Sequence, residues 1–115
     1  QSEKIRSYNK FSNQKTEVDG IVFASKREAA RYQGLCLEQK AGWIRDLEPQ
    51  ITYRIEVNGQ LICKYIADFR YHANKVGPGE DYGVVVEDCK GHRTREYILK
   101  KKLMKACHNI DIKET

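Results

Sequence analysis

The 115-residue sequence contains two prolines, one tryptophan and no long apolar run. No stretch approaches the roughly eighteen apolar residues that a membrane-spanning helix needs, so we expect no contact with a membrane. The first fourteen residues lack the apolar core of a secretory signal. Repeats and low-complexity tracts are also absent. A chain of this length can bury one hydrophobic core, which excludes a two-domain enzyme.

Paired cysteine motifs are missing as well. The four cysteines are Cys36, Cys63, Cys89 and Cys107, with no Cys-x-x-Cys pair and no histidine pair nearby, which argues against a zinc knuckle. Two disulfides would be possible in a secreted protein. Each cysteine instead lies in a segment of apolar periodicity, as a buried free thiol does. This pattern favours a reducing compartment and a cytoplasmic protein.

Positive charge is present and unevenly distributed. The net charge is +5, from 21 basic and 16 acidic residues. Residues 1–15 carry four basic residues against one acid, and residues 91–105 carry six against one. We interpret residues 1–14 as a flexible basic N-terminal arm and residues 15–115 as a single domain. The two basic segments indicate an anionic partner, and nothing in the sequence indicates a small-molecule substrate.

The order of local patterns predicts an α+β or α/β fold in which a sheet is flanked by helices. Two turns, at Asp19-Gly20 and Asn58-Gly59, are typical of hairpins. Ser25 and Thr94 are suited to cap helices. The expected elements are a hairpin over 16–23, a helix over 25–40, an extended piece over 43–47 ended by Pro49, strands over 51–57 and 61–71, a central strand over 84–90, a helix over 95–107 whose Leu99, Leu103 and Cys107 share a face, and a last strand near 110–112.

Charged residues occur where burial should make them costly. Asp88 and Lys90 lie two residues apart on the most apolar strand, so their side chains point to the same face. Asp68 lies in the middle of another strand, between apolar neighbours. Buried carboxylates are costly unless they are paired or bind a metal, and two of them beside a lysine suit a hard divalent cation. The alternative is an Asp–Lys ion pair that only stabilises the sheet.

These residues resemble a known nuclease motif. Asp68, followed by Asp88-Cys89-Lys90 at the end of a valine-rich strand, resembles the PD-(D/E)XK nuclease superfamily, although Ala67 stands where the motif has proline. That superfamily has an αβββαβ core, here preceded by a β-hairpin. More narrowly, the strings at 16–20, 25–32, 65–69 and 86–91 resemble a family of small phage-encoded proteins that is grouped with these nucleases.

The resemblance implies an Mg²⁺- or Mn²⁺-dependent endodeoxyribonuclease, a hydrolase of phosphodiester bonds. Asp68, Asp88 and the carbonyl of Cys89 would bind the metal, Glu28 would complete the site directly or through water, and Lys90 would position or deprotonate the attacking water. Two alternatives stay open. Glu28 could serve only in a capping box with Ser25. A β-bulge would make Glu87 rather than Asp88 the ligand.

The expected substrate is DNA, and the basic segments supply the expected backbone contacts. With little chain beyond the core, branched DNA such as a Holliday junction, or duplex DNA that is nicked, is favoured over a specific sequence. A homodimer in the cytoplasm of a bacterial host would cut two strands. The alternative is an inactive nucleic-acid-binding module of the same fold. The residues expected to contact DNA are Arg6, Lys10, Lys15, His92, Arg93, Lys101 and Lys105.

Overall fold

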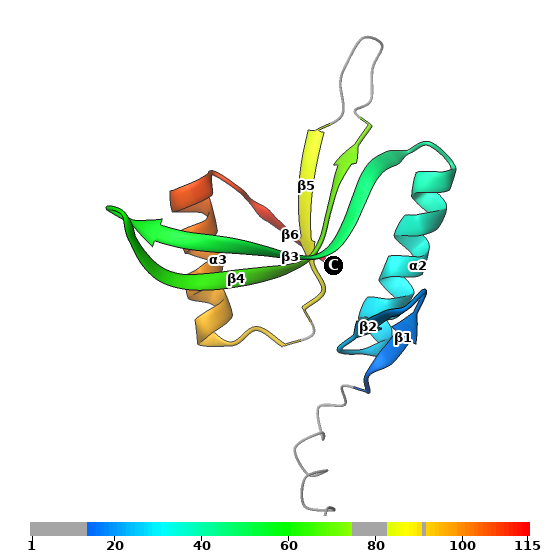
Figure 1. Cartoon of the computed structure of the whole chain (residues 1–115), viewed down its shortest axis with the longest axis horizontal. Coiled ribbons are helices and arrows are strands. Elements are labelled where there is room, and N and C mark those ends of the chain that lie inside the picture. The colour runs from blue at the N-terminus through cyan, green and yellow to red at the C-terminus, as the bar shows by residue number, and fades with distance from the viewer. Residues whose placement is uncertain (1–13, 75–82, 91) are drawn as a thin grey trace, which may run out of the picture.

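A computed structural model describes residues 14–74, 83–90 and 92–115 (Figure 1). The fold is α+β, as predicted, and the described residues form two helices and two separate sheets. Apart from Gln14, the predicted N-terminal arm lies outside the described residues. The elements are β1 (Thr16–Val18), β2 (Ile21–Phe23), α2 (Lys26–Lys40), β3 (Ile44–Val57), β4 (Gln60–Ala73), β5 (Gly83–Asp88), α3 (Arg95–His108) and β6 (Ile112–Glu114).

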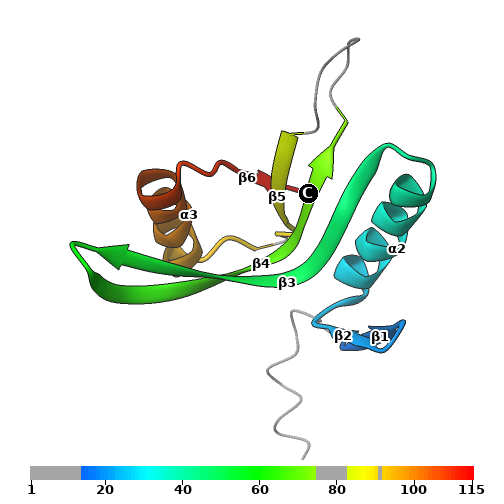
Figure 2. The ribbon, with the colours of Figure 1, turned by 45° about the horizontal axis from the view of Figure 1, so that its top comes forward.

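The larger sheet is mixed and has the order β3-β4-β5-β6. The pairs β3–β4 and β4–β5 are antiparallel, and β5–β6 is parallel, with α3 as the connection between them. Figures 1 and 2 show α3 against the hairpin end of the long β3–β4 ribbon and α2 alongside its other end. The small β1–β2 hairpin lies beside the first turn of α2 (Figure 2).

Local signals predicted the hairpin turns and the helix starts correctly. Each turn has two residues at positive φ, as two-residue hairpin turns require. The φ values are 52° and 78° for Asp19 and Gly20, and 52° and 80° for Asn58 and Gly59. The Ser25 hydroxyl accepts from the Glu28 amide at 3.1 Å. The Thr94 hydroxyl accepts from the Tyr97 amide at 3.0 Å. Each bond satisfies one free donor of the first helical turn.

The predicted interruption at Pro49 is wrong. Strand β3 continues from Ile44 to Val57, and Pro49 pairs with Phe69 of β4. An edge strand tolerates proline because half of its N–H groups point away from the sheet. The pairing of β3 with β4 shifts register between Arg45 and Glu48, where Asp46 has a φ of 56°. The ladder is therefore irregular just before Pro49.

The predicted apolar face of α3 is also wrong. Tyr97 and Met104 are the buried residues of this helix, whereas Leu99 and Cys107 are exposed. Leu103 packs against the core as predicted. The four cysteines are free thiols, as expected, although only three of them are partly buried. Neither described helix is long and apolar enough to cross a membrane.

Two apolar clusters share strand β4. The first cluster includes Tyr65 and Ala67 together with Tyr97 and Met104 of α3. The second includes Phe69 and Tyr71 of β4 together with buried residues of α2. These four residues alternate along β4, so their side chains lie on one face of the strand. Because the strand twists, this face contacts α3 at one end and α2 at the other. Asp68 lies at the point where this change occurs.

Candidate functional site

Strand pairing brings Asp68 and Asp88 together. Phe69 pairs with Glu87 in the antiparallel β4–β5 ladder, so one further step places Asp68 opposite Asp88. Facing residues of such a ladder have Cβ atoms about 5 Å apart, close enough for their carboxyl groups to meet. The amide of Cys89 donates to Oδ2 of Asp68 at 2.7 Å. The two carboxyl groups therefore lie side by side where β5 ends.

Asp88 is held by a tyrosine and a lysine. Only 1% of its surface is exposed, and the Tyr65 hydroxyl donates to its Oδ2 atom. The Lys90 ammonium lies 3.4 Å from Oδ1. The same ammonium lies 4.5 Å from the centre of the Tyr97 ring, a cation–π contact. The contact of Tyr65 with Asp88 was not predicted, because the strand pattern assigns the Tyr65 side chain to the apolar core.

The Asp68–Asp88 pair is electrostatically unfavourable. Burial, a hydrogen bond to Asp88 and the charge of Asp88 raise the pKa of Asp68 to about 9, against the lowering effect of the Cys89 amide. At neutral pH Asp68 is therefore protonated and donates to the Asp88 carboxylate. Two carboxyl groups in contact and away from water hold one negative charge more readily than two. A divalent cation in place of the proton would supply the missing positive charge.

Glu87 faces the opposite side of β5. It is fully buried, and Arg31 of α2 donates to both of its carboxylate oxygens, at 2.9 Å and 2.7 Å. The Tyr71 hydroxyl also donates to it. Burial alone would raise the pKa of Glu87, but the hydrogen bonds from Arg31 and Tyr71 hold it below its ordinary value. Because the described β4–β5 ladder has no bulge, Asp88 rather than Glu87 lies beside Asp68.

Glu28 lies near the aspartates in the first turn of α2. Its amide donates to the Ser25 cap, and its side chain lines a cleft of about 360 Å³ together with Asp68 and Ile66. Its charge contributes to the raised pKa of Asp68. In the part of the chain that the structure describes, no three His, Cys, Asp or Glu side chains are close enough together to hold a metal ion. Glu28 is therefore a neighbour of the pair rather than a third contacting carboxylate.

The segment from Asp88 to Lys90 is fixed by the end of β6. The amide of Thr115 donates to the carbonyl of Asp88 at 3.0 Å, and the amide of Lys90 donates to the carbonyl of Thr115 at 3.3 Å. The Cys89 thiol lies 3.4 Å from the Thr115 hydroxyl, and burial raises the pKa of this thiol. These contacts hold the backbone rigid at the point where the carboxylate and the ammonium emerge.

The described basic residues that were predicted to contact DNA are exposed or pair with acids other than Asp68 and Asp88. Arg6 and Lys10 lie outside the described residues, and Lys15 and His92 are exposed. The Arg93 and Lys101 side chains lie 3.5 Å and 2.9 Å from the Glu114 carboxylate, and that of Lys105 lies 3.1 Å from Asp111. These last three basic residues line another hollow, along α3 and β6.

Two basic residues that the sequence analysis missed adjoin Lys90 instead. Lys64 and Lys100 line a hollow of about 300 Å³ together with Lys90 and Tyr97. Lys64 belongs to β4 and Lys100 to α3, so only the folded chain brings them together. In the sequence, Lys100 is the first of three consecutive lysines, and their spacing alone does not show which of them faces the sheet.

Residues 8–115 match the model of a family described as "Protein of unknown function (DUF1064)". The chain belongs to this family. No curated protein and no solved structure matches it significantly. The match includes Asp68, Asp88 and Lys90 together with every described helix and strand, so the carboxylate pair and its lysine lie within the DUF1064 domain.

Proposed function

We propose that this protein is a metal-dependent DNA endonuclease of the PD-(D/E)XK type, which hydrolyses phosphodiester bonds with Mg²⁺ or Mn²⁺. The observation that carries the proposal is the contact between the Asp68 and Asp88 carboxyl groups, with the Lys90 ammonium 3.4 Å from Asp88. The order from α2 to β6, one helix, three strands, a helix and a strand, supports it, because the superfamily core has the same order.

The donor set fits a hard divalent cation. Oxygen atoms are the ligands that Mg²⁺ and Mn²⁺ prefer, and Asp68, Asp88 and the backbone carbonyl of Cys89 would hold the ion. The raised pKa of Asp68 supports this assignment, since a bound cation would favour the ionised form of Asp68 and so replace its proton. When bound, such an ion polarises the phosphate and makes a water molecule more acidic.

The surrounding side chains have distinct roles in this proposal. Lys90 would orient the attacking water and stabilise the negative charge that develops on the phosphate. Tyr65 binds one oxygen of Asp88 and so leaves the other directed at Lys90. Glu28, on the wall of the same cleft as Asp68, would act on the ion directly or through water.

For the substrate we propose branched DNA, such as a Holliday junction, or duplex DNA that is nicked. The described residues form the larger sheet, two helices and the small β1–β2 hairpin, and none of these elements forms a separate domain that could read a base sequence. We also propose a homodimer in a bacterial cytoplasm, whose two sites would cut two strands. The exposed apolar side chains of Val57, Leu61 and Ile62 at the β3–β4 turn offer surface that a second copy could cover.

A nucleic-acid-binding module without chemistry is the second candidate. Two observations favour it. Asp88 is almost fully buried and already bonded to Tyr65 and Lys90. Within the described residues no third His, Cys, Asp or Glu joins the pair at ligand distance.

A cleavage assay distinguishes the two candidates. Junction, nicked, duplex and single-stranded DNA are each incubated with Mg²⁺, Mn²⁺ or EDTA, and with the variants Asp88→Asn and Lys90→Ala. Asp111→Asn is the matched control, because Asp111 is exposed and lines the other hollow, along α3 and β6. We expect divalent-dependent cleavage that falls by at least about 100-fold in both site variants, since each removes a group that acts on the transition state.

The control variant should cleave at the wild-type rate, and Asp88→Asn should still bind DNA. DNA binding without cleavage in either metal would contradict the nuclease and support the binding module. Cleavage that survives Asp88→Asn would assign the chemistry to another site.

A further inference from the structure

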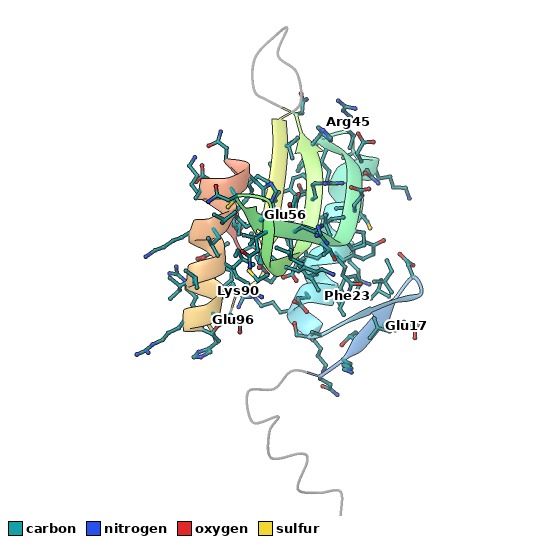
Figure 3. All side chains as sticks on the ribbon, turned by 60° about the vertical axis from the view of Figure 1, so that its left-hand side comes forward. Glu17, Phe23, Arg45, Glu56, Lys90 and Glu96 are labelled. Atoms are coloured by element: carbon teal, nitrogen blue, oxygen red, sulfur yellow. The ribbon has the colours of Figure 1, made fainter. Side chains whose placement is uncertain are left out.

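Three lysines from separate elements converge on the hollow beside Lys90. Lys64 comes from β4, Lys90 from the segment after β5 and Lys100 from α3, and the rings of Tyr65 and Tyr97 line the same space. The volume of the hollow is about 300 Å³. Figure 3 shows Lys90 and Glu96 beside the first turns of α3.

Positive charge exceeds negative charge in this hollow. Among the described residues that line it, Glu96 is the only acid, and its carboxylate lies 3.2 Å from the Lys100 ammonium. The Glu96 side chain is 75% exposed, and such exposed helix pairs are weak. An incoming anion can therefore exchange with Glu96 at little cost. On β3, the residue that pairs with Lys64 is Arg54, which adds no negative charge.

The hollow adjoins the carboxylate cleft. Ile66 lines both spaces, and 60% of its surface is exposed. Ile66 is therefore a wall that the lysine hollow shares with the cleft lined by Asp68 and Glu28. A nucleic-acid strand that crosses Ile66 would present one phosphate to Asp68 and a neighbouring phosphate to the lysines.

We infer that the hollow formed by Lys64, Lys90 and Lys100 is a subsite for a backbone phosphate next to the one that is cut. This inference rests on the proposed function in that it takes DNA as the substrate. Lys64 and Lys100 bind the phosphate as point charges and hold the strand in register with Asp68 and Asp88. Lys90 lines this hollow, and its ammonium also lies 3.4 Å from the Asp88 carboxylate.

The test compares two pairs of lysines. Lys64→Gln/Lys100→Gln removes two charges from this hollow, and Lys101→Gln/Lys105→Gln removes two charges from the other hollow of α3. Affinity for fluorescein-labelled duplex and junction DNA is measured by anisotropy in EDTA over a series of salt concentrations. For the first pair we expect about a 10-fold loss of affinity and a salt slope smaller by about one, as for one phosphate contact. Lys101 and Lys105 belong to the predicted DNA-contact residues, and we expect their removal to cost less affinity than removal of the first pair.

Parallel cleavage assays separate this inference from the nuclease proposal. If wild-type protein cleaves DNA and both lysine pairs bind equally well, the subsite is wrong and the nuclease stands. If only Lys64→Gln/Lys100→Gln loses affinity and the wild type cleaves nothing, the hollow stands as a phosphate-binding site of a DNA-binding module and the nuclease is wrong. A larger loss for Lys101→Gln/Lys105→Gln places the strand on the other hollow and overturns the subsite. No binding by the wild type in EDTA also overturns the subsite, and cleavage with Mg²⁺ or Mn²⁺ then decides the nuclease separately. Thermal unfolding of each variant confirms that it is folded.

Discussion

At the scale of single residues, the ionisation of Asp68 affects the stability of the fold. Its carboxyl keeps a proton up to about pH 9 in the folded protein, whereas in the unfolded chain it loses the proton near its ordinary pKa of 3.8. Between these two values the unfolded state gains stability by ionising, and the folded state does not. The net effect is that Asp68 destabilises the metal-free fold increasingly as the pH rises through this window.

Asp68→Asn should therefore stabilise the protein in EDTA. Asparagine has nearly the same shape and no proton to lose, so we expect the free energy of unfolding to rise by at least about 1 kcal/mol near pH 8. This corresponds to roughly 4 °C in Tm, and the gain should be smaller near pH 5. Thermal unfolding at both pH values measures the effect, with the exposed Asp111→Asn as control. A lower Tm for Asp68→Asn at the higher pH would contradict the assignment of the proton to Asp68.

At the scale of elements, the Arg31–Glu87 contact attaches α2 to the middle of the sheet. Arg31 bonds both oxygens of a fully buried carboxylate, and Tyr71 adds a third bond from β4. This pairing keeps Glu87 turned towards α2 and so keeps Asp88 turned towards Asp68. The orientation of the candidate site therefore depends on a helix that supplies neither aspartate.

Removing this guanidinium should be costly. Arg31→Ala leaves the Glu87 carboxylate buried without its cation, and we expect it to lower the free energy of unfolding by about 3 kcal/mol. The matched control is Arg54→Ala, because Arg54 pairs with Glu56 at 3.0 Å where both side chains are exposed. That variant should change stability by less than about 1 kcal/mol. Urea denaturation measures both values, and equal losses would show that the buried pair has no special role.

The elements also show which features could be predicted from the sequence. The turns at Asp19-Gly20 and Asn58-Gly59 and the caps Ser25 and Thr94 were predicted because their causes are local. The continuity of β3 through Pro49 was missed, because it depends on pairing with β4. The buried face of α3 was predicted wrongly. Leu99 and Leu103, on either side of three consecutive lysines, have helical spacing, and this spacing favoured a face other than the one that contains Tyr97 and Met104.

The same distinction holds for the candidate site. Strand alternation and the motif were sufficient to single out Asp68, Asp88 and Lys90, and pairing places the two aspartates in contact. The partners Tyr65 and Arg31 were missed, because they lie 23 and 56 residues from the carboxylates they bind. Only the register of the sheet and the packing of α2 bring them there. Glu28 lies at the edge of the cleft. Its amide donates to the Ser25 cap, and its charge contributes to the raised pKa of Asp68.

At the scale of the whole molecule, two apolar clusters meet on β4 close to the candidate site. One cluster is formed with α3 and the other with α2, and Asp68 lies between them in the sequence of β4. If the two parts unfold together, damage to one cluster must destabilise the other. If they unfold separately, the carboxylate pair would lie on a boundary between two independent units.

Met104→Ala distinguishes these cases. Met104 is fully buried in the α3 cluster, so its truncation should cost about 2–5 kcal/mol. Trp43, the only tryptophan, follows α2 and reports on the other part. We expect Trp43 fluorescence and far-UV circular dichroism to show the same lowered urea midpoint, because β4 links the two clusters. An unchanged Trp43 transition would contradict this. Leu99→Ala, at an exposed position of α3, should shift stability by less than about 0.5 kcal/mol.

The contact between Arg31 and Glu87 also limits how this domain can vary in evolution. Replacing Arg31 alone leaves the buried Glu87 charge without its cation, and replacing Glu87 alone removes the contact of α2 with the sheet. We therefore expect the two positions to change together among related chains. The order of the two acids carries information as well. Glutamate at 87 has the extra methylene that spans the distance to α2, while the shorter aspartate at 88 fits beneath Tyr65. An inverted Asp-Glu order would keep the composition and the charge of the chain and still lose both partnerships.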